Sequence, residues 1–199
     1  MNTLWDRFEG VMVRGEEDDR IAGDFNMWVF VLGDLVIFGA YFVVFMVHRF
    51  HEPELFRASQ GHLNLLIATL NTIVLLTSSQ LVARAVHAAR QGDDAAVRRL
   101  ITQAGGLGAL FVVLKVTEWV IEISRGYTLP SDEFFMFYFC LTGVHLLHVL
   151  LGLLIFGVVL HEIRQGSGRR VTLVEAGATY WHMVDVIWVL LFAVLYLLR

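Results

Sequence analysis

Five long apolar runs dominate this sequence, and they leave few folds open to it. About 20 apolar residues in a helix cross the hydrocarbon core of a bilayer, where each segment must satisfy its own backbone hydrogen bonds. The chain is 57% hydrophobic and only 17% charged, whereas soluble domains average about 25% charged residues. We therefore predict an all-α polytopic membrane protein, a bundle of five transmembrane helices at about residues 25–48, 63–86, 104–123, 134–161 and 176–198.

The segments between these runs are short, so we expect one transmembrane domain over residues 25–199, preceded by an N-terminal segment over 1–24. The connections, such as a His-rich one at 51–62 and an Arg-rich one at 84–99, are expected to be loops. Ten Lys and Arg residues lie on the side of the N-terminus and four on the other side. Because cytoplasmic loops carry the excess of Lys and Arg, we predict a cytoplasmic N-terminus, a periplasmic C-terminus and a place in the bacterial inner (plasma) membrane.

The fifth run, VEAGATYWHMVDVIWVLLFAVLYLL, carries ionisable side chains that lipid would not tolerate. It contains His182 and Asp185, with Glu175 at its entrance, and helical spacing places the three on one side. A carboxylate in hydrocarbon costs several kcal/mol unless it is paired or neutralised. We therefore expect the chain to be organised around this helix, with the His182–Asp185 pair linking it to the third or fourth run.

Asp34 is the one acidic residue of the first run. It stands about nine residues into the predicted helix, or about 14 Å along its axis, which is close to the bilayer midplane. Gly33 and Gly39 would let another helix approach it closely. An ionisable residue at this depth is usually functional, so Asp34 is a candidate for proton handling. The alternative is a polar residue that only hydrogen-bonds a neighbouring helix.

Lys115, Glu118 and Glu122 stand three and four residues apart in the third run, so they share one face of a helix. An internal ion pair between Lys115 and Glu118 is the expected arrangement. The alternative is that this face contacts the fifth helix or another subunit.

Two histidines, His145 and His148, share a face of the fourth run. With His182 they could ligate haem or a metal, since imidazole is the commonest metal-binding side chain. A carboxylate-bridged metal pair would require Glu-x-x-His patterns on two helices, and the runs contain none. We therefore expect no metal site and favour a buried polar network in which these histidines hydrogen-bond to the available carboxylates of Glu118, Glu175 and Asp185.

Two other classes of protein fit these residues. A haem-binding membrane redox protein would use His145, His148 or His182 as axial ligands. A proton-coupled transporter would use Asp34, Lys115 and Asp185 as a relay, although such transporters usually have broken helices at the midplane, and none is evident in the sequence.

The chain resembles subunit III of the haem-copper oxidases, cytochrome c oxidase subunit 3, over all five runs. The most specific pieces are LTGVHLLHVLLG in the fourth run and EAGATYWHMVDVIW in the fifth, and LNTIVLLTSS in the second and TEW around Glu118 add to them. The short five-helix form is similar to the quinol-oxidase type. The stretch MWVFVLGDLVIFGAYF is similar to the subunit-III-like proteins associated with nitric oxide reductase.

The resemblance implies a non-catalytic subunit of a terminal oxidase or of a nitric-oxide-reductase-type relative. Such a subunit carries no cofactor of its own. It packs beside catalytic subunit I, which holds the haem and copper, and beside other oxidase subunits. It also binds phospholipid and supports proton uptake. Asp34 falls where the family places a membrane-embedded carboxylate, commonly glutamate.

Overall fold

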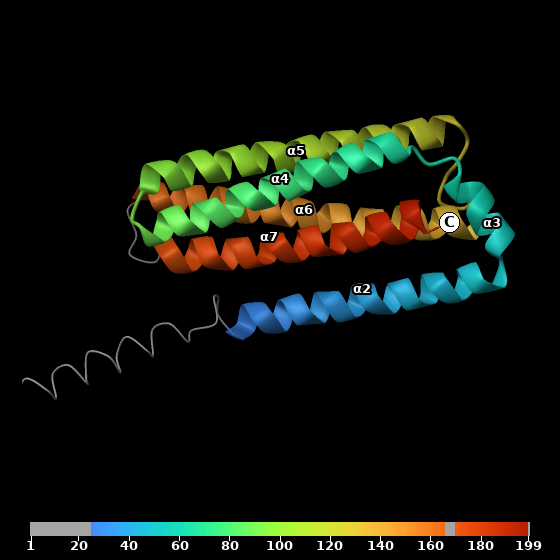
Figure 1. The fold of residues 1–199 in the computed structure, drawn as a ribbon, viewed down its shortest axis with the longest axis horizontal. Helices are drawn as coiled ribbons and strands as arrows, with labels where there is room; N and C mark the ends of the chain where they lie inside the picture. Colours follow the sequence, from blue (N-terminus) through green and yellow to red (C-terminus); the bar gives the residue numbers. More distant parts are fainter. Residues whose placement is uncertain (1–24, 166–169, 199) are drawn as a thin grey trace, which may run out of the picture.

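The computed structural model describes residues 25–165 and 170–198, and every regular element in these ranges is a helix (Figure 1). The five long helices are each long and apolar enough to cross a membrane, which confirms the predicted fold class. They are α2 (Phe25–His51), α4 (Leu65–Arg90), α5 (Asp94–Ser124), α6 (Glu133–Gln165) and α7 (Arg170–Phe192), the last continued by the π-helix η1 (Ala193–Leu197). The predicted N-terminal segment 1–24 lies outside the described residues, and its cytoplasmic placement stays a prediction.

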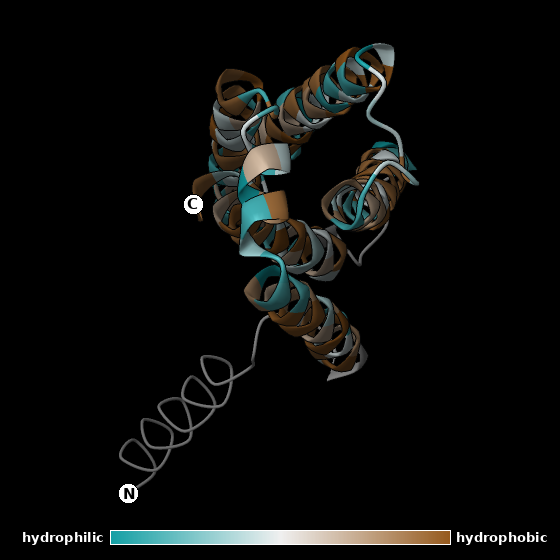
Figure 2. Ribbon diagram, turned by 90° about the vertical axis from the view of Figure 1, so that its right-hand side faces the viewer, coloured by the Kyte–Doolittle hydropathy of each residue, from teal (hydrophilic) through white to brown (hydrophobic). Residues whose placement is uncertain are grey.

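Helices α4 to α7 form a closed four-helix bundle, in which each helix packs against two others: α4 on α5, α5 on α6, α6 on α7 and α7 on α4. Helix α2 lies outside this bundle, against α7 and α6 (Figures 1 and 2). In the most apolar window of α7 56% of the residues are buried, against 17% in α2. The expectation that the chain is organised around the fifth helix is therefore confirmed.

Two expected loops are largely helical. Residues 51–62 contain α3 (Pro53–Gln60), which begins with a proline at its first turn, where the missing N–H costs nothing. Its Phe56 is fully buried against the rings of Phe45 and Phe134. A hydrogen bond from the Ser59 hydroxyl to the Asp132 carboxylate, at 2.6 Å, fixes α3 to the start of α6.

The prediction that the Arg-rich connection at 84–99 is a loop is wrong, because only residues 91–93 interrupt the helices. Gly92 has φ +76°, a left-handed conformation that a side chain would disfavour. The Asp93 carboxylate then accepts a hydrogen bond from the Ala96 amide at 2.9 Å and caps α5. The turn is tight, so α5 begins at Asp94, ten residues before the apolar run from which we predicted it.

The helices of the bundle pack tightly where the Trp181 side chain of α7 lies against α5 and α6. Its indole is fully buried and packs on Phe156, with ring centroids 4.6 Å apart. A Cβ atom at Gly152 would lie 2.6 Å from this indole, and one at Gly108 would lie 2.7 Å from it. Because both positions are glycine, α5 and α6 can both pack against the Trp181 indole.

Candidate functional site

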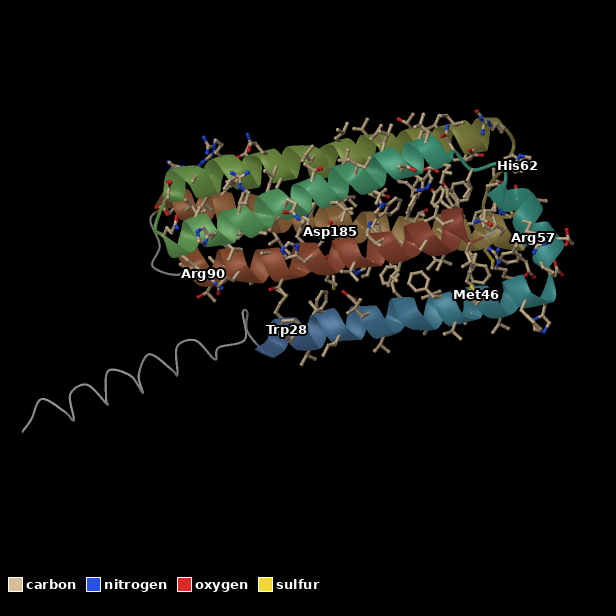
Figure 3. The ribbon with its side chains drawn as sticks, in the orientation of Figure 1. Trp28, Met46, Arg57, His62, Arg90 and Asp185 are labelled. Atoms are coloured by element: carbon tan, nitrogen blue, oxygen red, sulfur yellow. The ribbon has the colours of Figure 1, made fainter. Side chains whose placement is uncertain are left out.

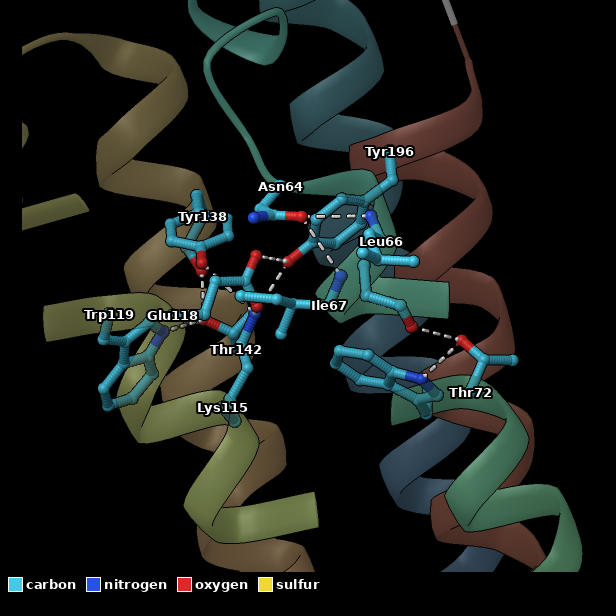
Figure 4. A network of polar contacts seen from close by, with 12 residues as sticks. Asn64, Leu66, Ile67, Thr72, Lys115, Glu118, Trp119, Tyr138, Thr142 and Tyr196 are labelled. Atoms are coloured by element: carbon cyan, nitrogen blue, oxygen red, sulfur yellow. Dashed lines mark hydrogen bonds and ion pairs between the residues drawn. The ribbon is translucent and has the colours of Figure 1, made fainter. Parts of the chain in front are cut away.

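A cluster of polar side chains surrounds Lys115 of α5, which is fully buried (Figure 4). Its Nζ donates to the Glu118 carboxylate at 3.0 Å and lies 3.2 Å from the Tyr138 hydroxyl and 2.7 Å from the Tyr196 hydroxyl. The Tyr196 hydroxyl in turn donates to the other Glu118 oxygen at 2.7 Å. The expected ion pair between Lys115 and Glu118 is therefore confirmed.

Aromatic rings complete the surroundings of the Lys115 ammonium group. It lies 4.6 Å from the ring centroid of Tyr138, 5.3 Å from that of Trp188 and 5.4 Å from that of Tyr196. A cation attracted to ring faces and hydrogen-bonded to a carboxylate tolerates removal from water. Because these rings come from α6, α7 and η1, this face of α5 also contacts the fifth span, as the alternative expected. Contact with another subunit stays a prediction.

One turn along α5, the buried Glu122 carboxylate pairs with Arg125 at 3.1 Å, and Arg125 also donates to the His62 carbonyl at 3.3 Å. The second carboxylate oxygen of Glu122 has no hydrogen-bond partner among the described residues. This pair ties the end of α5 to the segment between α3 and α4.

His145 of α6 is fully buried, and within the described part of the chain neither of its ring nitrogens has a hydrogen-bond partner. Its ring packs against Phe111 and Trp188, with centroids 5.7 Å and 5.3 Å away. The expected hydrogen bond from His145 to a carboxylate is therefore wrong. The aromatic side chains of Phe111 and Trp188 occupy the space that a carboxylate would need.

The polar stripe of α7 faces α4 (Figure 3). His182 Nδ1 lies 2.7 Å from the Ser79 hydroxyl of α4 and 4.0 Å from the Asp185 carboxylate. At the end of the bundle the Glu175 carboxylate pairs with Arg90 of α4 at 2.9 Å. The prediction that the His182–Asp185 pair links α7 to the third or fourth run is wrong, because Ser79, the partner of His182, lies on the second run, α4.

Asp34 of α2 meets His148 of α6, with Oδ2 and Nε2 3.3 Å apart and both side chains less than one-fifth exposed. His148 Nδ1 lies 2.8 Å from the Val144 carbonyl oxygen. The predicted role of Gly33 and Gly39 is wrong, since a Cβ at either would meet no atom within 4 Å. At this point α2 contacts the bundle through the Asp34–His148 pair.

The two ring nitrogens of His148 face different groups. A carbonyl oxygen only accepts, so His148 Nδ1 must carry the hydrogen that Val144 receives. His148 Nε2 faces the Asp34 carboxylate, whose Oδ2 has no hydrogen-bond partner among the described residues.

No group of three or more His, Cys, Asp or Glu side chains in residues 25–165 and 170–198 is arranged to hold a metal ion. The three candidate ligands His145, His148 and His182 are held by different neighbours: aromatic rings, the Asp34 carboxylate and the Ser79 hydroxyl. These residues make contacts between helices, and within the described residues they form no common centre.

The family model for cytochrome c oxidase subunit III matches residues 14–199. The chain belongs to the cytochrome c oxidase subunit III family. It is 32% identical to cytochrome c oxidase subunit 3 of Thermostichus vulcanus over 188 residues, which cover 91% of this chain and 88% of that protein. It is 33% identical to the subunit 3 of Corynebacterium diphtheriae over 175 residues, covering 86% of this chain and 85% of that one. It is therefore a subunit III of a haem-copper oxidase, a multi-pass protein of the bacterial plasma membrane.

A third relative differs in organisation. The haem-copper oxidase subunit I+III of Aeropyrum pernix is 30% identical to this subunit III over 184 residues, which are 86% of this chain and 22% of that longer protein. The family assignment favours the subunit III interpretation over the haem-binding redox protein and the transporter.

The two most specific sequence motifs of this subunit III pack against each other. LTGVHLLHVLLG lies on α6 and EAGATYWHMVDVIW on α7. They meet at three places: Gly152 against Trp181, the His148 carbonyl accepting from the Tyr180 hydroxyl at 3.1 Å, and His145 against Trp188.

Several residues that complete the polar network were missed in the sequence. Tyr138 and Tyr196 read as ordinary apolar residues, although a tyrosine hydroxyl inside a span needs a partner and so gave a usable signal. Ser79 lies in the uncharged polar run of α4, and Arg90 was counted only as a cytoplasmic charge. The periodicity of a single helix does not indicate which neighbouring helix Ser79 and Arg90 would contact.

Proposed function

We propose that this subunit III has no catalytic centre of its own, packs beside catalytic subunit I and other oxidase subunits, and supports proton uptake by its complex. The haem and copper reside in subunit I. The chain in Aeropyrum pernix that joins subunits I and III supports the partnership. The observation that carries the proton role is the Asp34–His148 pair, a partly buried contact between a carboxylate and an imidazole on the outer side of the four-helix bundle.

The apolar surface of α2 and α6 supports a place for phospholipid. A pocket of about 170 Å³ opens between these helices and has an almost entirely apolar wall, which suits an acyl chain. Its lining residues are Ile37, Phe38, Tyr41, Cys140, Leu141 and Val144.

Purification of the tagged chain in mild detergent tests the partnership. We expect subunit I to co-purify with its haem and copper. We expect the separated subunit III to be colourless, because its histidines already have other neighbours. A Soret band at one haem per separated chain would contradict the accessory role and favour the haem-binding alternative.

Asp34→Asn tests the proton role. The substitution keeps the shape and much of the hydrogen-bonding capacity of the side chain but removes its titration. We expect the assembled variant to turn over more slowly or to inactivate sooner, most visibly at high pH, where protons are scarce. Asp34→Glu, which keeps a carboxylate, should behave nearly like the parent. Steady-state oxidase turnover across pH is the measurement.

A matched control is Glu54→Gln on α3, a carboxylate-to-amide change at a side chain that is 88% exposed. Its pH profile should match that of the parent. Superimposable profiles for Asp34→Asn and the parent would remove the proton role and leave Asp34 as a contact between α2 and α6.

A further inference from the structure

A charged groove of about 420 Å³ lies at the turn between α4 and α5, at the end of the bundle where Figure 3 labels Arg90. Both helices contribute to its wall. Its lining includes the cationic side chains Arg84 and Arg99, one from each helix, together with His87. The proposed function of this subunit makes no use of it, and it lies away from α2 (Figure 1).

The two arginines of this groove have no partner among the residues that the structure describes. Neither Arg84 nor Arg99 forms an ion pair or a hydrogen bond within the described ranges, whereas their neighbour Arg90 is paired with Glu175. The one carboxylate in the lining, Asp93, accepts from the Ala96 amide as the cap of α5. His87 is engaged with Gln91, with 2.9 Å between the two nitrogens. The groove is therefore lined by two guanidinium groups and one carboxylate, which leaves an excess of positive charge.

The depth of the groove points to a membrane ligand. Arg84 stands six residues before the end of α4 and Arg99 five residues after the start of α5, which is about 8–9 Å inside the helix ends. Arginines in the last turns of a span extend toward the phosphates of the lipid headgroups. Ala83, Ala88, Ala96 and Leu100 line the same groove, so an apolar wall adjoins the charged one.

We propose that this groove binds the headgroup of an anionic phospholipid, with its phosphodiester between Arg84 and Arg99. Guanidinium groups bind phosphate oxygens through paired N–H donors. The alanines and Leu100 would lie along the glycerol and the first carbons of the acyl chains. A soluble phosphate would satisfy the arginines but would gain nothing from this apolar wall.

Native mass spectrometry of the intact oxidase complex, titrated with phosphatidylglycerol, tests the site. We expect Arg84→Gln and Arg99→Gln each to weaken binding of one phosphatidylglycerol about tenfold, as loss of a charge-assisted hydrogen bond predicts. The double variant should lose that molecule. Arg98→Gln is the matched control, because Arg98 is exposed at the same end of α5 but does not line the groove.

Two further arms distinguish the ligands. Phosphatidylcholine, whose headgroup has no net charge, should bind at least tenfold more weakly, and inorganic phosphate should not displace phosphatidylglycerol. Equal binding of the two lipids, displacement by phosphate, or full binding by the double variant would each overturn the proposal. If the double glutamine variant fails to assemble, R84K/R99K keeps the charge without the paired donors, and it should still bind phosphatidylglycerol more weakly than the parent.

Discussion

Gly152→Ala is expected to destabilise this subunit III more than any other substitution that adds a single methyl group. The added Cβ would lie 2.6 Å from the Trp181 indole, which cannot retreat because it is fully buried and Gly108 of α5 lies against it as well. Overpacking of a closed core costs about 1–3 kcal/mol and occasionally more. Thermal unfolding of the detergent-solubilised protein, followed by tryptophan fluorescence, measures the effect.

Gly157→Ala is the matched control in the same helix, since a Cβ there would meet no atom within 4 Å. Alanine is the better helix former, so this variant should be neutral or slightly stabilised. The double variant G152A/W181F, with a smaller ring, should recover part of the loss. Equal unfolding temperatures for Gly152→Ala and Gly157→Ala would show that α6 and α7 are not in contact as described.

Lys115→Met should have a comparable or larger effect, for an electrostatic reason. It would leave the Glu118 carboxylate fully buried without its cation, although the Tyr196 hydroxyl would still donate to it. Breaking a buried pair by removing one partner costs about 3–5 kcal/mol. We expect a lower unfolding temperature and a lower ratio of subunit III to haem in the purified complex.

The double variant K115M/E118Q separates charge from packing. Replacing both members of a buried pair is often nearly neutral, and glutamine can still accept a hydrogen bond from Tyr196. The double variant should therefore be more stable than Lys115→Met alone. If it is equally unstable, Lys115 does more than neutralise Glu118, and its contacts with the rings of Tyr138 and Trp188 must hold the bundle together.

The five spans and the central place of α7 could be predicted because each depends on one helix alone. Length and hydropathy reveal a span, and the polar stripe of His182 and Asp185 requires burial wherever the partners lie. The identity of those partners depends on how the helices pack, so Ser79 and Arg90 were missed. A stripe shows which side of a helix is buried but not which neighbour covers it.

Helix ends and α3 were misjudged for a related reason. Hydropathy marks the part of a helix in hydrocarbon, whereas α5 continues for ten residues into the polar zone, where Asp93 caps it. The segment PELFRASQ is polar in composition, and Phe56 is the one large apolar side chain of this segment that is buried against the bundle. The environment of His145 was also beyond prediction, because Phe111 and Trp188 come from two other helices.

In the closed bundle each of the four helices packs against two others of the bundle. A cut in the backbone outside the bundle therefore leaves every contact between α4, α5, α6 and α7 unchanged. Helix α2 joins that bundle only from its outer side, through contacts with α6 and α7. A break in the backbone near Gly61, between α3 and α4, would therefore divide the protein into a self-sufficient bundle and a helical arm. The two pieces, made separately, should reassemble in one membrane, with the Asp34–His148 pair as the meeting point that identifies correct docking.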